Sequence, residues 1–397
     1  MVNFLIRRLF YAALVLLTIS FITYGLLYIA PGGPLDFLLL QQQDSDKQLN
    51  EADIDRLLQS YELDLTLPVR FSRWLIGWPT GPIHIGSNAL FANTQVGCLR
   101  EGEANLVYPD GTVVKSNCIR PVYLSNLVGR ESSRGILNGD FGKSRVILKE
   151  RPVSLLLASR VGPTLQLQGL ATFLALLFAI PIGIYSAYKQ DSKFDYIATN
   201  ITFLGASLPT LFWGIMFILL FGLAFKEWGL PYLFFDGDIS PTDRAMPLIG
   251  NIVAGSAFDR IWHIILPAGV LMFVSLAGWS RFIRASMLEV LRQDYVRTAR
   301  SKGATERLVV LRHALRNALI PFITLVVGII PGLFGGAVVT ESIFSWPGVG
   351  RLFLGSLLAA DYPVSMAIFW IGAVLFLIAV LLADILYTVV DPRIRLS

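Results

Sequence analysis

The chain has 397 residues, of which 54% are hydrophobic and 15% are charged. An average soluble domain has roughly 25% charged residues, so this composition excludes an ordinary water-soluble enzyme. The net charge is +5, and the charged residues are concentrated in a few segments. This distribution indicates basic loops beside a membrane and argues against nucleic-acid binding.

Six stretches of about 20 residues or more lack Asp, Glu, Lys and Arg, and each could cross about 30 Å of hydrocarbon as a helix. A helix also satisfies its own backbone hydrogen bonds inside lipid. We therefore expect an all-α polytopic membrane protein with six transmembrane helices and a small, partly β extracytoplasmic insertion. The stretches are 9–30, 161–188, 196–225, 261–280, 317–340 and 362–383.

The first 30 residues are expected to form a retained transmembrane helix. Arg7 and Arg8 precede the apolar run, and the residues after it lack the small-residue cleavage pattern of a signal peptide. Short segments on one side of the six spans hold 15 basic residues, which predicts that both termini are cytoplasmic. Residues 391–397 are then a cytoplasmic tail.

Residues 31–160 carry balanced charges and are expected to form an extracytoplasmic loop. Both cysteines, Cys98 and Cys118, fall in it, and on the oxidising side of a membrane a disulfide between them would close a loop of about 20 residues. Two free thiols are the alternative. Residues 108–112 read as a hairpin turn, so we expect a partly β insertion over about 90–134.

Residues 161–390 are expected to form a five-helix core. The stretch 246–258 is too short and too rich in Gly and Asn for a further span, so we expect an interfacial or re-entrant piece there. The interiors of the spans hold no carboxylate, which disfavours a carrier that binds a driving ion at membrane depth.

A phosphate-binding loop is missing. Gly142-Lys143-Ser144 imitates the end of such a loop, but Leu137 stands where the first glycine is needed. We therefore expect no ATP site and no cofactor in this chain, and a channel-like subunit driven by a partner.

Residues 281–316 form the longest predicted inner segment and hold nine basic residues. Two helices, about 282–302 and 305–317, are expected to meet at Gly303, which can take a positive φ, with Thr305 capping the second helix. A partner could grip this projecting elbow as a lever. The alternative is a solvated basic loop that only fixes topology.

At this point the sequence resembles the inner-membrane permease subunits of ATP-binding-cassette importers, in the dipeptide, oligopeptide and nickel branch, and in particular the first of their two permeases. The resemblance covers about 1–75 and 138–397. Its motifs are residues 4–9 with 30–34, Arg297-Thr298-Ala299 followed by Gly303, His313 through residue 321, Glu341 through Gly350, and 391–395.

The resemblance implies that the EAA-like loop docks in a cleft of an ATPase subunit. The matching positions are Arg297, Thr298, Ala299, Gly303 and Ala304, with Arg297 and Thr298 replacing the Glu-Ala of the general motif. The spacing from Gly303 to the end of the motif is also longer than in the general form, as is usual in the peptide branch. These departures leave open which side chains make the contacts.

The resemblance also implies an assembly in a prokaryotic inner membrane: a second homologous permease, two ATP-binding subunits that hydrolyse ATP, an extracytoplasmic solute-binding protein and the lipid bilayer, without nucleic acid. The insertion around Cys98 and Cys118 departs from the family, whose loop is shorter, and either contacts the binding protein or braces the outer mouth.

The sequence thus predicts a transport subunit, not an enzyme, that forms half of an inward pathway for di- or oligopeptides. Nickel chelates or oligosaccharides are alternative substrates. An ion-coupled carrier working alone, or a non-transporting scaffold or sensor, is the alternative from another class. The residues that line the path are not assigned.

Overall fold

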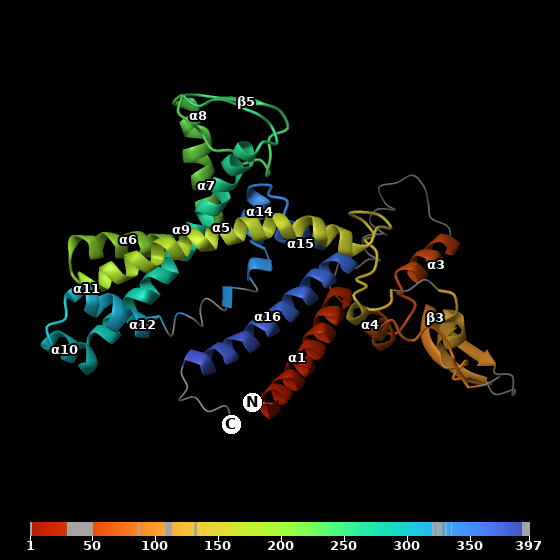
Figure 1. Ribbon diagram of the computed structural model, residues 1–397. Coiled ribbons are helices and arrows are strands. Elements are labelled where there is room, and N and C mark those ends of the chain that lie inside the picture. Colours follow the sequence, from red (N-terminus) through yellow and green to blue (C-terminus); the bar gives the residue numbers. More distant parts are fainter. Residues whose placement is uncertain are drawn as a thin grey trace. The chain divides into compact units, whose positions relative to one another are not determined.

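The computed structural model describes residues 2–29, 51–85, 88–107, 113–130, 133–319, 322, 328–329, 332–334 and 336–390 (Figure 1). The chain divides into two compact units. The first unit comprises Met1–Ala12, Leu157–Gly355 and Ile371–Ser397, and the second comprises Ala13–Leu156 and Ser356–Trp370.

Five helical segments among the described residues are long and apolar enough to cross a membrane. They lie in α1 (Val2–Ile29), α5 (Val153–Tyr188), α9 (Ala257–Leu291), α16 (Tyr362–Val390) and the continuous run Thr210–Glu227. The predicted count of six is therefore not matched within this part of the chain. Ten of the 24 residues of the predicted span 317–340 lie outside the described residues.

The predicted span 196–225 is broken. α6 (Lys193–Ser207) ends before Pro209, and α7 (Thr210–Phe217) starts a new helix that continues through the π-helical η3 (Ile218–Ala224) into α8 (Phe225–Glu227). Pro209 has no N–H, and it holds Leu208 in an extended conformation at φ −111° and ψ 144°. The break leaves the second half, 210–227, as the candidate span.

The first unit is built around the long helices α5 and α9. α6 packs along α9, as Figure 1 shows, and Gly205 permits the approach because a Cβ there would lie 3.0 Å from the Cβ of Ala277. Further helices in the described part of this unit are α10 (Asp294–Ser301), α11 (Glu306–Leu308), the π-helical η4 (Val309–Ala314), α12 (Leu315–Ala318), α14 (Val338–Ile343) and α15 (Val349–Leu358). The last of these runs into the second unit.

The expected interfacial piece at 246–258 is largely a hairpin. β5 (Arg244–Met246) pairs antiparallel with β6 (Gly250–Ile252), and α9 then begins at Ala257 behind the N-cap Ser256. The buried carboxylate of Asp259 accepts hydrogen bonds from Ser240 and Gly255, which ties this outer connection to the first turn of α9.

The second unit contains α3 (Glu51–Ser60), α4 (Leu67–Ile76) and the predicted β insertion. β3 (Gln95–Val107) pairs antiparallel with β4 (Val113–Tyr123), so the expected strands are confirmed, while their turn at 108–112 lies outside the described residues. Cys98 and Cys118 form a disulfide. The other elements are β1 (Ile83–Ile85), β2 (Asn88–Leu90), η1 (Leu124–Leu127) and η2 (Ile136–Asn138).

The insertion has its own small core. Leu65, just before α4, packs with Val96 and Val122 of the hairpin and with Leu124 and Leu127 of η1. The backbone of the same segment pairs with β3, since Cys98 N donates to Asp64 O at 2.7 Å. The hairpin is therefore fixed to the start of α4 by apolar contact and by main-chain hydrogen bonds.

Candidate functional site

Residues 292–308, which we call the coupling surface, form a short helix, a turn and the start of a second helix. α10 precedes Gly303, and α11 follows it. Gly303 has φ +80° and no atom within 4 Å of an added Cβ, so its backbone conformation, not crowding, requires glycine. The predicted turn at Gly303 is confirmed.

The first predicted helix, 282–302, is wrong as one continuous element. α9 ends at Leu291, and α10 starts at Asp294. Gln293 between them is extended, at φ −72° and ψ 149°. The carboxylate of Asp294 lies in the first turn of the new helix, where its negative charge interacts favourably with the helix dipole. The coupling surface therefore leaves the axis of α9.

The second helix starts where predicted. Thr305 occupies the N-cap position at φ −64° and ψ 144°, but its hydroxyl makes no capping hydrogen bond. α11, η4 and α12 then follow one another without a break from Glu306 to Ala318.

The coupling surface rests on a rigid base in the first unit. Val310, Ala314 and Ala318 of the second helix pack with a buried cluster that includes Ala179 of α5 and Ile283 of α9. α10 contacts η4, with Val296 fully buried. Close-packed side chains therefore connect α10, through η4, to α5 and α9.

A polar contact adds to this base. The Asn317 side-chain amide donates to the Tyr295 hydroxyl at 2.8 Å and joins α10 to the end of the second helix. Arg300 and Glu306 form an ion pair at 2.8 Å across the turn at Gly303. This hydrogen bond and this ion pair both help to hold the elbow in its shape.

The exposed side of the elbow is basic. Arg292, Arg297, Arg300, Lys302 and Arg307 are exposed, against the exposed acids Asp294 and Glu306. This excess of positive charge suits an acidic groove on a partner.

The structure brings the five predicted coupling residues onto this one elbow. The Arg297 side chain is 73% exposed, and the exposed Thr298 hydroxyl donates to Asp294 O at 2.9 Å. Gly303 is exposed, whereas Ala299 and Ala304 are partly buried. Arg297 and Thr298 are thus presented for contact.

A partly buried ion pair that sequence reasoning missed lies near this base. Asp195, at the start of α6, accepts hydrogen bonds from Nε and Nη2 of Arg284 on α9, each at 2.7 Å. These bonds are the main reason that the pKa of the Asp195 carboxyl lies below its usual value, with the Asp191 N–H adding to the effect and desolvation opposing it. The pair fastens α6 to α9.

At another place in the first unit, Glu341 of α14 lies fully buried. Its carboxylate accepts hydrogen bonds from Thr164 Oγ1 at 3.0 Å, from Arg351 N at 2.9 Å and from Ala337 N at 3.3 Å. Thr164 Oγ1 in turn accepts from Val349 N at 2.7 Å. The carboxylate therefore joins three parts of the chain: α5, the start of α14 and the start of α15.

Three glycines, which we call the glycine cage, surround this carboxylate. An added Cβ at Gly336 or Gly348 would lie under 3.0 Å from Glu341, and one at Gly350 would lie 3.0 Å from it. In addition, Trp346 Nε1 donates to Pro163 O at 2.9 Å. The sequence motif 341–350 is thus a packed knot against α5, a role that its glycine density alone does not specify.

The chain matches two known protein families. Residues 179–396 match the family described as binding-protein-dependent transport system inner membrane component, and residues 1–101 match its N-terminal counterpart. The chain belongs to this family of inner-membrane permeases. The match includes the coupling surface, the ion pair of Asp195 and the glycine cage.

Curated relatives support the peptide branch of these permeases. The chain is 34% identical to the oligopeptide transport system permease protein AppB of Bacillus subtilis (strain 168), over all of both chains. It is 40% identical to the dipeptide transport system permease protein DppB of Escherichia coli (strain K12), over 66% of this chain and 78% of that one. A putative peptide permease protein of Brucella suis is 31% identical over the full length of both.

Two solved structures are similar over part of the chain. An inward-facing MetNI methionine ABC transporter has a TM-score of 0.45 at 14% identity, over 60% of this chain and 97% of that one. An amino acid ABC transporter with histidines has a TM-score of 0.39 at 17% identity, over 61% and 95%. The chain is a multi-pass inner-membrane permease of the ABC importer type.

Proposed function

We propose that this permease moves di- or oligopeptides inward as half of a translocation pathway and is driven by ATP hydrolysis in partner subunits. The names of the full-length and partial relatives support the substrate class. The partners would be a second homologous permease, two ATP-binding subunits and an extracytoplasmic solute-binding protein. Both termini and the coupling surface would face the cytoplasm.

The observation that carries the proposal is the exposed basic elbow on a rigid base. Arg297 and Thr298 are displayed on α10, while Val296 on the same helix is buried. An ATPase groove that closes on α10 would displace it together with α5 and α9, because the side chains beneath it are close-packed. Alternating access would then follow from rocking of these helices.

The test is a substitution at Gly303, in the turn of the elbow. Valine at position 303 is costly at φ +80°, so Gly303→Val should distort the angle between α10 and α11 and reduce ATP-dependent dipeptide uptake by the assembled transporter at least about tenfold. The partner ATPases, assayed alone, should keep their activity.

The matched control is Gly229→Val, at a glycine with φ +67° and open space beside its Cβ position. It carries the same type of backbone cost far from the elbow in sequence and should leave uptake within about twofold of the unmodified protein. Unimpaired uptake by Gly303→Val, or equal losses in both variants, would refute the lever role of the elbow.

A further inference from the structure

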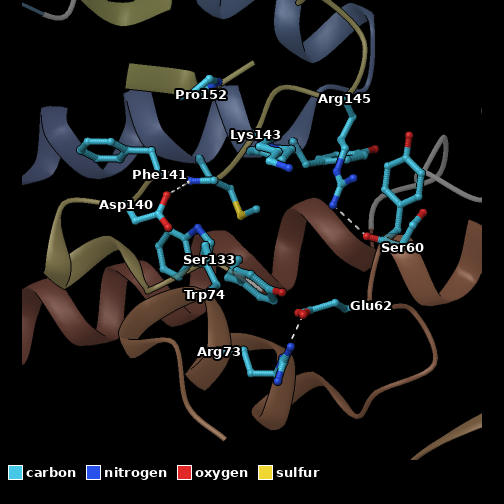
Figure 2. Close-up of a pocket in the computed structure, with 16 residues that line it drawn as sticks. Ser60, Glu62, Arg73, Trp74, Ser133, Asp140, Phe141, Lys143, Arg145 and Pro152 are labelled. Atoms are coloured by element: carbon cyan, nitrogen blue, oxygen red, sulfur yellow. Dashed lines mark hydrogen bonds and ion pairs between the residues drawn. The ribbon is translucent and has the colours of Figure 1, made fainter. Parts of the chain in front are cut away.

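The second unit contains a cavity of about 460 Å³, drawn in Figure 2. It lies between the start of α16, the residues that follow α3, helix α4 and the loop around 133–152, with Tyr24 of α1 at its edge. Small-molecule sites commonly occupy roughly 300–1,000 Å³, so the size suits a small organic ligand.

One side of the cavity carries a fixed carboxylate. Glu62 accepts a hydrogen bond from Arg73 Nε at 2.8 Å through Oε1, while Arg73 itself is only 1% exposed. Within the described part of the chain, Arg73 is the one partner of the Glu62 side chain, which leaves Oε2 to accept from a ligand. The backbone of Glu62 has φ +59°, a conformation that is energetically unfavourable for residues other than glycine.

The opposite side carries two cations, Lys143 and Arg145, as Figure 2 shows. Arg145 Nη2 donates to Ser60 O at 2.9 Å. The exposed Glu150 lies 3.6 Å from Lys143 and 3.4 Å from Arg145, which are long distances for ion pairs. A ligand carboxylate could therefore compete with Glu150 for both cations.

Buried contacts hold that side in place. The fully buried Asp361 accepts hydrogen bonds from the Ser144 hydroxyl at 2.6 Å and from the N–H groups of Arg145, Val146 and Ile147 at 3.1, 3.1 and 3.0 Å. The backbone that presents the cations is thus set before any ligand arrives, which lowers the entropy lost on binding.

Aromatic rings also line the cavity. Trp74 packs against Tyr24, with ring centroids 5.4 Å apart, and Tyr61 lies under the Arg145 guanidinium at 5.5 Å. Burial is the main cause that raises the pKa of Tyr61, so its hydroxyl stays protonated. These rings offer an apolar surface to a side chain of the ligand.

We propose that this cavity binds a short peptide with free termini, with its ammonium group at Glu62, its carboxylate at Lys143 and Arg145, and a side chain against Trp74. Opposite charges on facing sides favour a zwitterion, because a peptide with a blocked terminus would lose its charge-assisted hydrogen bonds either to Glu62 or to Lys143 and Arg145. The choice of a peptide as the ligand rests on the proposed function. The location of the site in this unit does not.

The experiment measures binding to the full chain in lipid nanodiscs, without partner subunits, by isothermal titration calorimetry. The probes are the dipeptide Ala-Phe, N-acetyl-Ala-Phe and Ala-Phe amide. Ala-Phe should bind saturably, and each blocked probe should bind at least about tenfold more weakly. Because no ATPase is present, failure here leaves the proposed transport function standing, and failure of ATP-driven uptake leaves this result standing.

Two variants locate the binding. Glu62→Gln should weaken the binding of Ala-Phe about tenfold and leave the binding of N-acetyl-Ala-Phe unchanged. The acetylated probe has no ammonium group that could contact Glu62. Glu227→Gln, at an exposed carboxylate of α8, is the matched control and should change neither. Ser133→Trp keeps all the charges and should weaken Ala-Phe by filling the cavity.

Three results would overturn the proposal. These are equal binding of all three probes, equal loss of the free and acetylated peptides in Glu62→Gln, and Ala-Phe binding that Ser133→Trp leaves intact. Saturable binding of glycerophosphoethanolamine in the absence of Ala-Phe binding would assign the cavity to a lipid headgroup and would also overturn it.

Discussion

Glu341 shows how a buried carboxylate is kept in an apolar segment. Isolated burial of such a group costs several kcal/mol, and here hydrogen bonds from Thr164, Arg351 and Ala337 offset that cost. The glycine cage lets the backbone come close enough to donate. Gly348 is therefore required by the carboxylate itself, whereas added Cβ atoms at Gly336 and Gly350 would first meet the backbone of Gly350 and Val338.

Gly348→Ala should destabilise the protein, because its Cβ would lie under 3.0 Å from the Glu341 carboxylate. We expect a loss of about 1–3 kcal/mol, seen as a lower apparent melting temperature of the purified chain. Gly355→Ala is the matched control, since an added Cβ there meets nothing within 4 Å. Equal melting temperatures for the two variants would contradict the proposed cage.

The Asp195–Arg284 pair predicts a pH dependence. The pKa of Asp195 is lower in the folded chain than the unfolded value of about 3.9, because Arg284 hydrogen-bonds its charged form. Its contribution to stability is therefore fully present above about pH 4 and is lost as the pH falls through the folded value.

Melting temperatures measured across this acidic range check that prediction. Asp195→Asn should melt at a lower temperature than the unmodified chain at pH 7, and the difference should shrink as the pH falls below about 4. Glu227→Gln, at an exposed carboxylate of α8, is the control and should melt like the unmodified chain across this range. A difference that is independent of pH would show that the pair acts only by packing.

These residue contacts were beyond prediction from the sequence. The motif at 341–350 is visible as a pattern, but the Thr164 hydroxyl that contacts Glu341 is 177 positions away. Asp195 and Arg284 are 89 positions apart and carry no motif of their own. Only the packing of α14 against α5 and of α6 against α9 brings these partners together.

At the scale of elements, apolar length predicted the spans well and missed the breaks. Pro209 is a local signal that ends α6, and it was present in the sequence as a reason to divide 196–225. The division between α9 and α10 at Gln293 has no Gly or Pro to mark it. The contacts of α10 with η4, which follows it in the chain, accompany this division.

Asp361 links two elements of the second unit, the loop at 144–147 and the start of α16. Replacement by Asn removes the charge and one acceptor oxygen, while bonds to a charged acceptor contribute roughly 1.5–3 kcal/mol. In Asp361→Asn, we expect the amides of residues 145–147 to exchange hydrogen with solvent at least about tenfold faster.

Hydrogen-exchange mass spectrometry of the purified chain measures this effect. Asp238→Asn, in the connection before β5, serves as the control and should leave those amides unchanged. Unaltered exchange in Asp361→Asn would mean that the loop is held by other contacts. Asp361 would then not be the residue that fixes this side of the cavity.

For the whole molecule, the sequence was most informative about class. Charge-free runs and the motifs around Arg297, Gly303 and Glu341 indicated a permease, and the family match agrees. The cavity in the second unit could not be predicted, because its charged groups come from separate segments and no motif connects Glu62 with Lys143.

The central claim is that work reaches this chain from partner subunits through the coupling surface. Uptake of labelled dipeptide into proteoliposomes tests it most directly, with the complete assembly compared with the purified chain alone. We predict accumulation only with the complete assembly and ATP, and none by the chain alone under a proton or sodium gradient. Concentrative uptake by the chain alone would contradict the account.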